Sequence, residues 1–259
     1  MQIAYSLQTI VTNSVAAENP QNLALQLTDT FNEVKAYCSE SDLKINTSKT
    51  QFIVFKSITK KLPSDLELVL DGVTIIKPVS SVKLLGTVLD QHLTMGPCID
   101  EIVKKCSGLL GMLRKASPYL SRELLRLAYI SLIRPHLEFA SIILAPAAIT
   151  HLRKLDVIQK IASRIICSAP SQAHSAPLQL ELGLASLDSR RTDHITKFID
   201  SILRGSCHPV FSDYFSVLDD GSITSSMIAP RTKLGSKRFR VFGSKVDNDR
   251  NCSVTSLTQ

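Results

Sequence analysis

Basic side chains are unevenly distributed along the chain, and their spacing could support the binding of a polyanion. The 259 residues include 30 Lys and Arg and 23 Asp and Glu, which gives a net charge of +7. Residues 98–170 hold 11 basic and 5 acidic residues, whereas the net charge is −1 over 1–97 and +2 over 171–259. A basic segment between nearly neutral ones suggests a surface that faces a polyanion. A solvated helical face accounts for the same charges equally well.

Ten basic residues of this segment are candidates for neutralising phosphate groups. They are Lys104, Lys105, Arg114, Lys115, Arg122, Arg126, Arg153, Lys154, Lys160 and Arg164. Aromatic residues make up 5% of the chain and are scattered, so a stacking platform for single strands is not supported.

Other chemistry finds little support in the sequence. The six cysteines include no Cys-x-x-Cys pair, so a disulfide scaffold or a zinc ribbon is excluded, and their sparse use fits a reducing, intracellular compartment, nuclear or cytoplasmic. No metal site is expected, because the nearest Cys and His groupings match no tetrahedral pattern. These groupings are Cys98 with Cys106, Cys167 with His174, and Cys207 with His208. There is no Gly-x-Ser-x-Gly elbow, glycine-rich nucleotide loop, secretory leader or apolar run of about 18 residues, so no membrane partner is expected.

The first part of the chain mixes strands with one helix. Segment 6–15 is rich in Thr, Val and Ile and predicts a strand end, and an apolar stripe after Asn19-Pro20 predicts a helix. Further strands are expected at 51–55, at 66–70 and 73–76 as a hairpin around Asp71-Gly72, and at 79–90. Gly86 falls inside the last of these strands, where a glycine often marks a bulge or a close backbone approach.

After Pro97 the spacing of apolar residues changes to the period of an α-helix. Helices are expected at 99–116, 121–134 and 150–166, with weaker ones at 176–183 and 190–204, and a loosely ordered tail from Gly205. In the second helix, Ser121 should be the N-cap and Arg134-Pro135 should end or kink the helix. The apolar face of this helix should consist of Leu124, Leu127, Ala128 and Leu132, with Arg122 and Arg126 opposite. The fold class is therefore α+β.

Five segments in colinear order resemble the later part of reverse transcriptases from non-LTR (LINE-type) retrotransposons. They are 19–55, 80–93, 118–144, 152–167 and 229–251. The resemblance implies three regions: a partial antiparallel palm sheet with a primer-grip hairpin at 1–97, a helical thumb-like region at 98–170, and a C-terminal connection with a poorly ordered tail at 171–259. Thumb helices of the family lie along the primer–template duplex, so the implied partner is an RNA–DNA or DNA duplex held weakly through its phosphates.

The resemblance also implies roles for individual residues. Asn46, Lys49 and Thr50 match the family's Asn-x-x-Lys-Thr turn, whose lysine lies near the phosphates of the incoming nucleotide and could act as a general acid. A solvated lysine in a polar turn is the alternative for Lys49. The primer grip corresponds to Leu84, Leu85 and Gly86, and a core strand with a bulge is the alternative there.

The metal-binding aspartates of the family have no counterpart in this sequence. The family holds Mg²⁺ with two aspartates of Tyr-Ala-Asp-Asp, and Tyr5 and Ser6 stand at the corresponding positions. No Asp or Glu precedes Glu18, and the fingers and a third aspartate are expected upstream of Met1. A phenol and a hydroxyl cannot replace two carboxylates around a hard cation at neutral pH. The chain is therefore predicted to hold no cofactor and to be inactive alone as a polymerase.

Three hypotheses remain open from the sequence. The chain is a reverse-transcriptase remnant that still binds nucleic acid, a domesticated binding or scaffold protein, or the product of a decayed element without a selected function. A partial palm would expose a sheet edge and an apolar face, which favours poor solubility or a partner that covers that face.

Overall fold

The fold is known from a computed structural model that describes residues 20–46, 49–61, 63, 66–70, 74–209, 211, 215–217 and 223–225. The chain forms two compact units, Met1–Val82 and Lys83–Gln259. Each unit is considered by itself. The strand expected at 6–15 lies outside the described residues.

The first unit contains one long helix, as predicted. Helix α1 (Pro20–Glu40) begins at a proline, whose fixed φ suits the first helical turn. The helix ends where Asp42 adopts a left-handed φ of 53° and the Leu43 N–H donates to the Cys38 carbonyl at 2.8 Å. Such a terminal bond satisfies a carbonyl group that the helix leaves unpaired.

Short strands complete this unit. Strand β2 (Leu68–Leu70), which contacts α1, pairs antiparallel with β3 (Thr74–Ile76) and confirms the expected hairpin. Strand β1 (Phe52–Ile53) pairs parallel with β4 (Pro78–Val79). The prediction of one antiparallel sheet is therefore wrong, because the described strands form four separate two-stranded sheets, one of them parallel. Strands of two to four residues offer too few ladder positions to join a wider sheet.

The segment at 79–90 is a hairpin instead of a single strand. Strand β5 (Ser81–Leu84) pairs with β6 (Thr87–Asp90), and Leu85 and Gly86 form the turn with φ values of 47° and 84°. Two positive φ values match the type I′ turn, whose twist suits a two-residue hairpin loop. Gly86 thus belongs to the turn, and the prediction that it lies inside a single strand is wrong.

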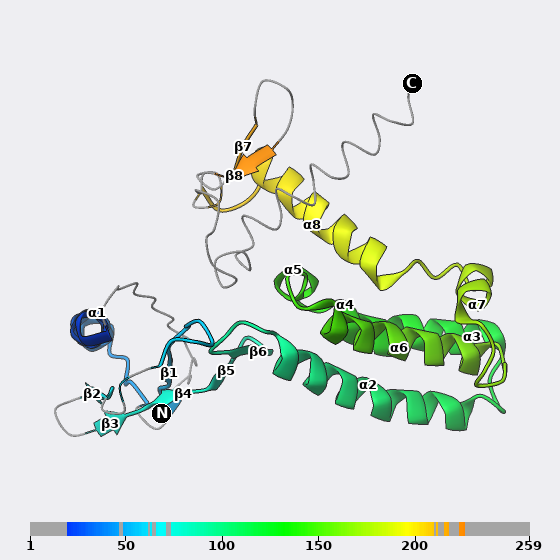
Figure 1. The fold of residues 1–259 in the computed structure, drawn as a ribbon, viewed down its shortest axis with the longest axis horizontal. Coiled ribbons are helices and arrows are strands. Elements are labelled where there is room, and N and C mark those ends of the chain that lie inside the picture. Colours follow the sequence, from blue (N-terminus) through cyan, green and yellow to red (C-terminus); the bar gives the residue numbers. More distant parts are fainter. Residues whose placement is uncertain are drawn as a thin grey trace, which may run out of the picture. The chain divides into compact units, whose positions relative to one another are not determined.

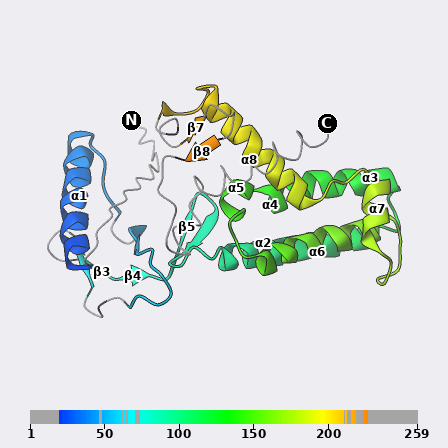
Figure 2. The same ribbon diagram turned by 45° about the horizontal axis from the view of Figure 1, so that its top comes forward.

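Two long helices form the centre of the second unit (Figures 1 and 2). Helix α2 (Gly96–Ala116) and helix α6 (Ile149–Ile166) pack lengthwise against each other. They run in the same direction, because contacts join their N-terminal ends and a shared hollow lies at their C-terminal ends. At the N-terminal ends, Lys154 Nζ lies 2.6 Å from Asp100 Oδ1, and a Cβ on Gly96 would come within 2.9 Å of the His151 ring.

The return segment between these helices contains a π-helical turn. Helix α3 (Arg122–Ala128), the π-helix η2 (Tyr129–Ile133) and α4 (Arg134–Glu138) follow one another without a break. Ser121 is the N-cap, as expected, and its Oγ accepts from the Leu124 N–H at 3.4 Å. Pro135 lacks an N–H donor and disturbs the α-helical ladder upstream, so a local widening is a physical response to it. The proline changes the helix type and does not end the helix.

The buried face of α3 and η2 differs from the predicted one. Leu125, Tyr129, Ile133 and Leu137 are buried at a spacing of four residues. The leucines expected to be buried are exposed instead, Leu124 by 50%, Leu127 by 59% and Leu132 by 54%. Leucines occur on both sides of this helix, so apolar periodicity alone could not choose the face. The apolar stripe expected at Leu124, Leu127 and Leu132 is therefore not the face that packs into the core.

The remaining elements cover the rest of the second unit. They are α5 (Ser141–Leu144), α7 (Ser175–Glu181), α8 (Leu187–Leu203), β7 (Phe215–Val217) and β8 (Ile223–Ser225). Strands β7 and β8, of three residues each, pair antiparallel within the segment expected to be a loosely ordered tail. No helix in the described part of the chain is long and apolar enough to cross a membrane.

Two exposed glycines within α2 provide a test of the helix assignment. A Cβ added at Gly108 or Gly111 would meet no atom within 4 Å. We expect Gly108→Ala and Gly111→Ala each to raise the free energy of unfolding by up to about 1 kcal/mol, because glycine is a poor helix former. Urea unfolding followed by circular dichroism measures the change.

The matched control for these substitutions is Gly183→Ala. Gly183 has a φ of +61°, a conformation that costs other residues roughly 1–2 kcal/mol. The control should therefore lower the stability. An equal loss for Gly108→Ala and Gly183→Ala would contradict an exposed helical position at Gly108.

Candidate nucleic-acid interface

The Asn46–Thr50 segment forms a hydrogen-bonded turn in the first unit. The Lys49 N–H donates to the Asn46 carbonyl at 3.1 Å and reaches Asn46 Oδ1 at 3.3 Å. The Thr50 hydroxyl donates to the Asn46 carbonyl at 2.9 Å. These bonds explain why an asparagine begins the turn and a threonine ends it, since short polar side chains satisfy local backbone groups. Lys49 is exposed, so its amine is open to a ligand in solution.

The Leu84–Gly86 segment lies in the second unit, at the turn between β5 and β6. Leu85 is 73% exposed and holds a left-handed φ, an uncommon conformation for a bulky residue. A Cβ at Gly86 would come within 3.4 Å of the Phe139 ring. The turn therefore presents Leu85 to solvent while its glycine packs against the chain's own aromatic ring.

The Asp90 carboxylate connects this hairpin to α2. Asp90 Oδ2 accepts from the N–H groups of His92 and Thr94 and from the Thr94 hydroxyl, at 3.0–3.2 Å. Oδ1 accepts from the Met95 N–H at 2.9 Å. Burial raises the pKa of Asp90, but the hydrogen bonds outweigh burial and leave that pKa below its ordinary value. Sequence reasoning missed this residue, although an aspartate at a strand end ahead of Gly96-Pro97 was a visible capping signal.

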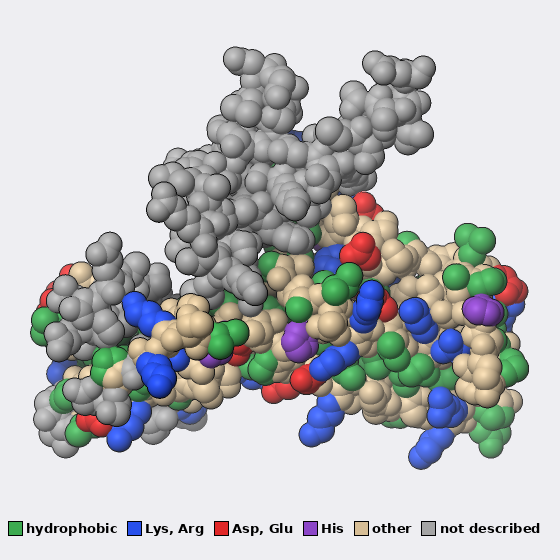
Figure 3. Space-filling view, in the orientation of Figure 1, with side chains coloured by type: hydrophobic (Ala, Val, Ile, Leu, Met, Phe, Trp, Pro, Cys, Tyr) green, Lys and Arg blue, Asp and Glu red, His purple; other side chains and the backbone are tan. Residues whose placement is uncertain are grey.

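The ten candidate basic residues all lie in the second unit, but they differ in their exposure and in their hydrogen-bond partners. Seven have exposed side chains: Lys104, Lys105, Arg114, Lys115, Arg153, Lys154 and Lys160. Of these seven, Lys154 alone makes an ion pair within the described part of the chain. Figure 3 shows Lys and Arg side chains spread over the helical unit, with apolar side chains between them.

The other three candidates are partly buried and hydrogen-bonded within the chain. Arg122 donates to Glu181 Oε1 at 2.6 Å and to Cys167 Sγ at 3.2 Å. Arg126 Nε donates to the Leu182 carbonyl at 2.6 Å, and Arg164 Nε donates to the Ala173 carbonyl at 2.9 Å. The hydrogen bond from Arg122 also lowers the pKa of the Glu181 carboxyl. These arginines therefore fasten α7 and the segment before it to the helices.

Three of the described cysteines, Cys98, Cys106 and Cys167, are held as thiols. Burial raises the pKa of the Cys106 thiol to about 11 and also raises the pKa of Cys98 and Cys167, so these thiols stay protonated at neutral pH. Within the described residues, no group of three His, Cys, Asp or Glu side chains could hold a metal ion.

A serine–histidine pair lies where α5 meets α8. Ser141 Oγ and His194 Nδ1 are 2.9 Å apart, and neither the spacing of these residues nor a motif pointed to the pair. A hydrolytic triad also needs a carboxylate on the second ring nitrogen. Among the described residues, His194 makes no hydrogen bond to a carboxylate, so the pair links the two helices. The Arg190–Glu138 ion pair, with Arg190 NH2 at 2.9 Å from Glu138 Oε2, supports the same junction.

The comparison with known proteins identifies a relative for most of the chain. A probable RNA-directed DNA polymerase from transposon BS of Drosophila melanogaster is 26% identical over 172 residues, which cover 65% of this chain. The chain is related to a transposon RNA-directed DNA polymerase. This relationship confirms the resemblance to retrotransposon reverse transcriptases that the five segments indicated. The aligned residues span 19% of the length of that protein. No family model and no solved structure matches the chain.

The hydrogen bonds accepted by the Asp90 carboxylate should make the stability of this chain depend on pH. We expect Asp90→Asn to lower the free energy of unfolding by about 1–3 kcal/mol at neutral pH, because hydrogen bonds to a buried carboxylate are weakened. The folded-state pKa lies below the ordinary value of 3.8, so the ionised group stabilises the fold at higher pH. The difference from the unsubstituted chain should be constant above about pH 5 and should shrink as the pH falls through the folded-state pKa.

Urea unfolding at a series of pH values measures this dependence. Asp100→Asn is the matched control, since Asp100 forms an exposed pair with Lys154 that contributes under about 1 kcal/mol. A stability difference for Asp90→Asn that persists unchanged down to pH 2 would contradict the assignment.

Proposed function

We propose that this chain corresponds to the late palm and thumb of a non-LTR retrotransposon reverse transcriptase and binds a primer–template duplex through its phosphates. The observation that carries the proposal is the set of exposed cations on α2 and α6. Lys104, Lys105, Arg114 and Lys115 project from α2, and Arg153 and Lys160 from α6. None of the six forms an ion pair within the described residues, so their charges remain available to a polyanion.

The arrangement along each helix suits a repeating ligand. Lys104 and Lys115 are eleven residues apart and therefore lie on one face of α2, separated by roughly 16 Å of helical rise. Arg153 and Lys160 are seven residues apart and share a face of α6. Charges repeated along helix faces can follow a sugar–phosphate backbone without reading its bases.

The remaining assignments follow from the family resemblance. Leu84, Leu85 and Gly86 are proposed as the primer grip, and the exposed turn at Leu85 is the part available to a primer end. Lys49, at the end of the Asn46 turn, is proposed to approach nucleotide phosphates, with Thr50 and Asn46 holding the turn. The proposed localisation is intracellular, nuclear or cytoplasmic.

The second candidate is a binding or scaffold protein without enzymatic activity. The exposed leucines of α3 and η2 favour it, because Leu124, Leu127 and Leu132 present large apolar side chains to solvent, which a protein partner could cover. Cooperative unfolding would distinguish either candidate from a non-functional product, and stabilisation on addition of a duplex would support nucleic-acid binding.

Duplex binding should depend steeply on salt. If six phosphates are contacted, the logarithm of the binding constant should fall with a slope of about −5 against the logarithm of salt concentration. Replacing Lys104 and Lys105 together by Gln should weaken binding to an RNA–DNA hybrid and reduce that slope by about 2. Fluorescence anisotropy between about 50 and 200 mM salt measures both quantities.

The control for this measurement is Lys197→Gln on α8, an exposed lysine outside the candidate set. The control should leave the slope unchanged. A flat salt response of the unsubstituted chain, or equal losses for both variants, would contradict phosphate binding through α2.

The chain alone should not extend a primer. Residues 1–17 contain no carboxylate, and two-metal polymerisation needs carboxylate ligands. We expect no Mg²⁺-dependent extension of a labelled primer on an RNA template, with an intact reverse transcriptase as the positive control. Extension that is lost on removal of Mg²⁺ would overturn this prediction.

A further inference from the structure

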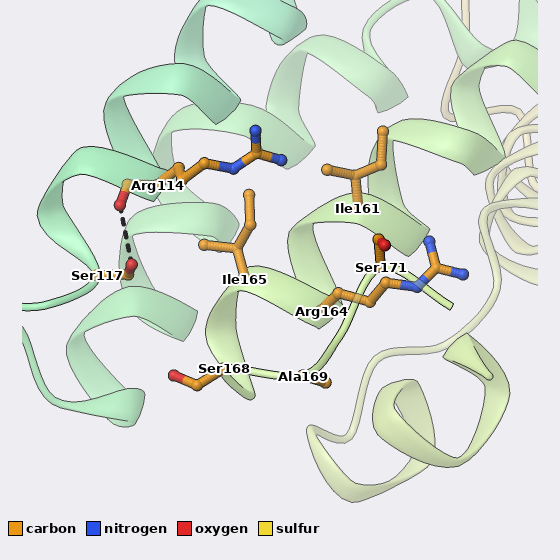
Figure 4. Close-up of a pocket in the computed structure, with 8 residues that line it drawn as sticks. All are labelled: Arg114, Ser117, Ile161, Arg164, Ile165, Ser168, Ala169 and Ser171. Atoms are coloured by element: carbon orange, nitrogen blue, oxygen red, sulfur yellow. Dashed lines mark hydrogen bonds between the residues drawn. The ribbon is translucent and has the colours of Figure 1, made fainter. Parts of the chain in front are cut away.

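A hollow of about 390 Å³ lies between the C-terminal ends of α2 and α6. Its cationic residues are Arg114 and Arg164, and Ile161 and Ile165 form its apolar part. In Figure 4 the Arg114 side chain extends from α2 toward α6, and the Arg164 guanidinium extends toward the segment that carries Ser171. The volume is at the lower end of the range for small-ligand pockets.

The electrostatics of the hollow favour an anion. None of its lining residues is acidic. The two parallel helices place their C-terminal ends here, and each end contributes roughly half a negative charge. The guanidinium groups of Arg114 and Arg164 together carry two positive charges, which exceed this helix contribution. The lining of the hollow therefore has a net positive charge.

Several hydrogen-bond donors in the hollow are unused within the described residues. Arg164 bonds the Ala173 carbonyl through Nε, which leaves both terminal nitrogens as donors. The Ser168 and Ser171 hydroxyls make no hydrogen bond within the described part of the chain. The Ser117 hydroxyl, in contrast, donates to the Arg114 carbonyl at 2.8 Å, as the dashed line in Figure 4 shows. Guanidinium and hydroxyl donors together suit the oxygens of a phosphate group.

We propose that this hollow binds the phosphorylated 5′ end of a nucleic-acid strand. A continuous backbone passes along a helix face, whereas a hollow between two helix ends can receive a strand terminus. A terminal phosphate monoester carries close to two negative charges at neutral pH, which match the two guanidinium groups. Ile161 and Ile165 would contact the first sugar. The inference rests on the proposed binding of nucleic acid by this unit.

The test compares two RNA–DNA hybrids of identical sequence, one with a 5′-phosphate and one with a 5′-hydroxyl group. We expect the phosphorylated hybrid to bind about tenfold more tightly at low salt, as measured by fluorescence anisotropy. Arg114→Gln should bring the ratio of the two affinities close to one. Lys115→Gln, on the same helix but outside the hollow, should weaken both hybrids and leave the ratio unchanged.

The outcomes separate this inference from the proposed function. Equal binding of the two hybrids by the unsubstituted chain would overturn the inference and leave duplex binding intact. If neither hybrid binds, the proposed function fails, and titration with inorganic phosphate then reports on the hollow alone through the amide resonances of Ser117 and Ser168. Shifts at these amides without hybrid binding would identify an anion site and would overturn the strand-end assignment. The absence of shifts would overturn the inference entirely.

Discussion

The parallel packing of α2 and α6 is the constraint on which the second unit depends. Two helices that run in the same direction need a return segment, and residues 117–148 provide it as α3, η2, α4 and α5. The core between these elements is continuous, and Tyr129 is fully buried in it. Its hydroxyl donates to Gln159 Oε1 at 2.9 Å, and Gln159 in turn donates to the Ala185 carbonyl at 3.0 Å. The π-helical turn thus connects the return segment to α6 through a satisfied buried network, which gives the core a single arrangement.

Parallel packing also has electrostatic consequences at the two ends of the pair. At the C-terminal ends, Arg114 and Lys115 of α2 and Arg164 of α6 offset the partial negative charges of the helices. At the other end, the Asp90 carboxylate receives the N–H of Met95, the N-cap residue of α2. The same residue ends strand β6, so one side chain fixes the direction in which the hairpin leads into the helix.

The sequence predicted the elements with a clear local signal. Helical periodicity located α1, α2, α6 and α8 to within a few residues, and Ser121 was recognisable as an N-cap because its chemistry is local. The β2–β3 hairpin was also predictable, but the parallel pairing of β1 with β4 was not, because it depends on contacts between residues distant in the sequence. The buried face of α3 was also predicted wrongly, because it depends on distant partners in and next to α7. Arg122 donates to the Glu181 carboxylate, and Arg126 donates to the Leu182 carbonyl. No sequence pattern shows that a carbonyl at Leu182 will lie next to an arginine 56 residues earlier.

This last failure affects the candidate interface directly. Counting charges treated ten basic residues as equivalent, but Arg122 and Arg126 are partly buried and each has a partner that the fold requires. If Arg126 exchanged its partner for a phosphate, the buried Leu182 carbonyl would be left without its hydrogen bond, which costs about 1–3 kcal/mol. Exposed lysines such as Lys104 and Lys160 form no ion pair within the described residues, and their flexible side chains can contact a nucleic-acid backbone. The electrostatic binding energy of this unit should therefore come from the exposed cations, while the hydrogen-bonded arginines hold the elements that carry them.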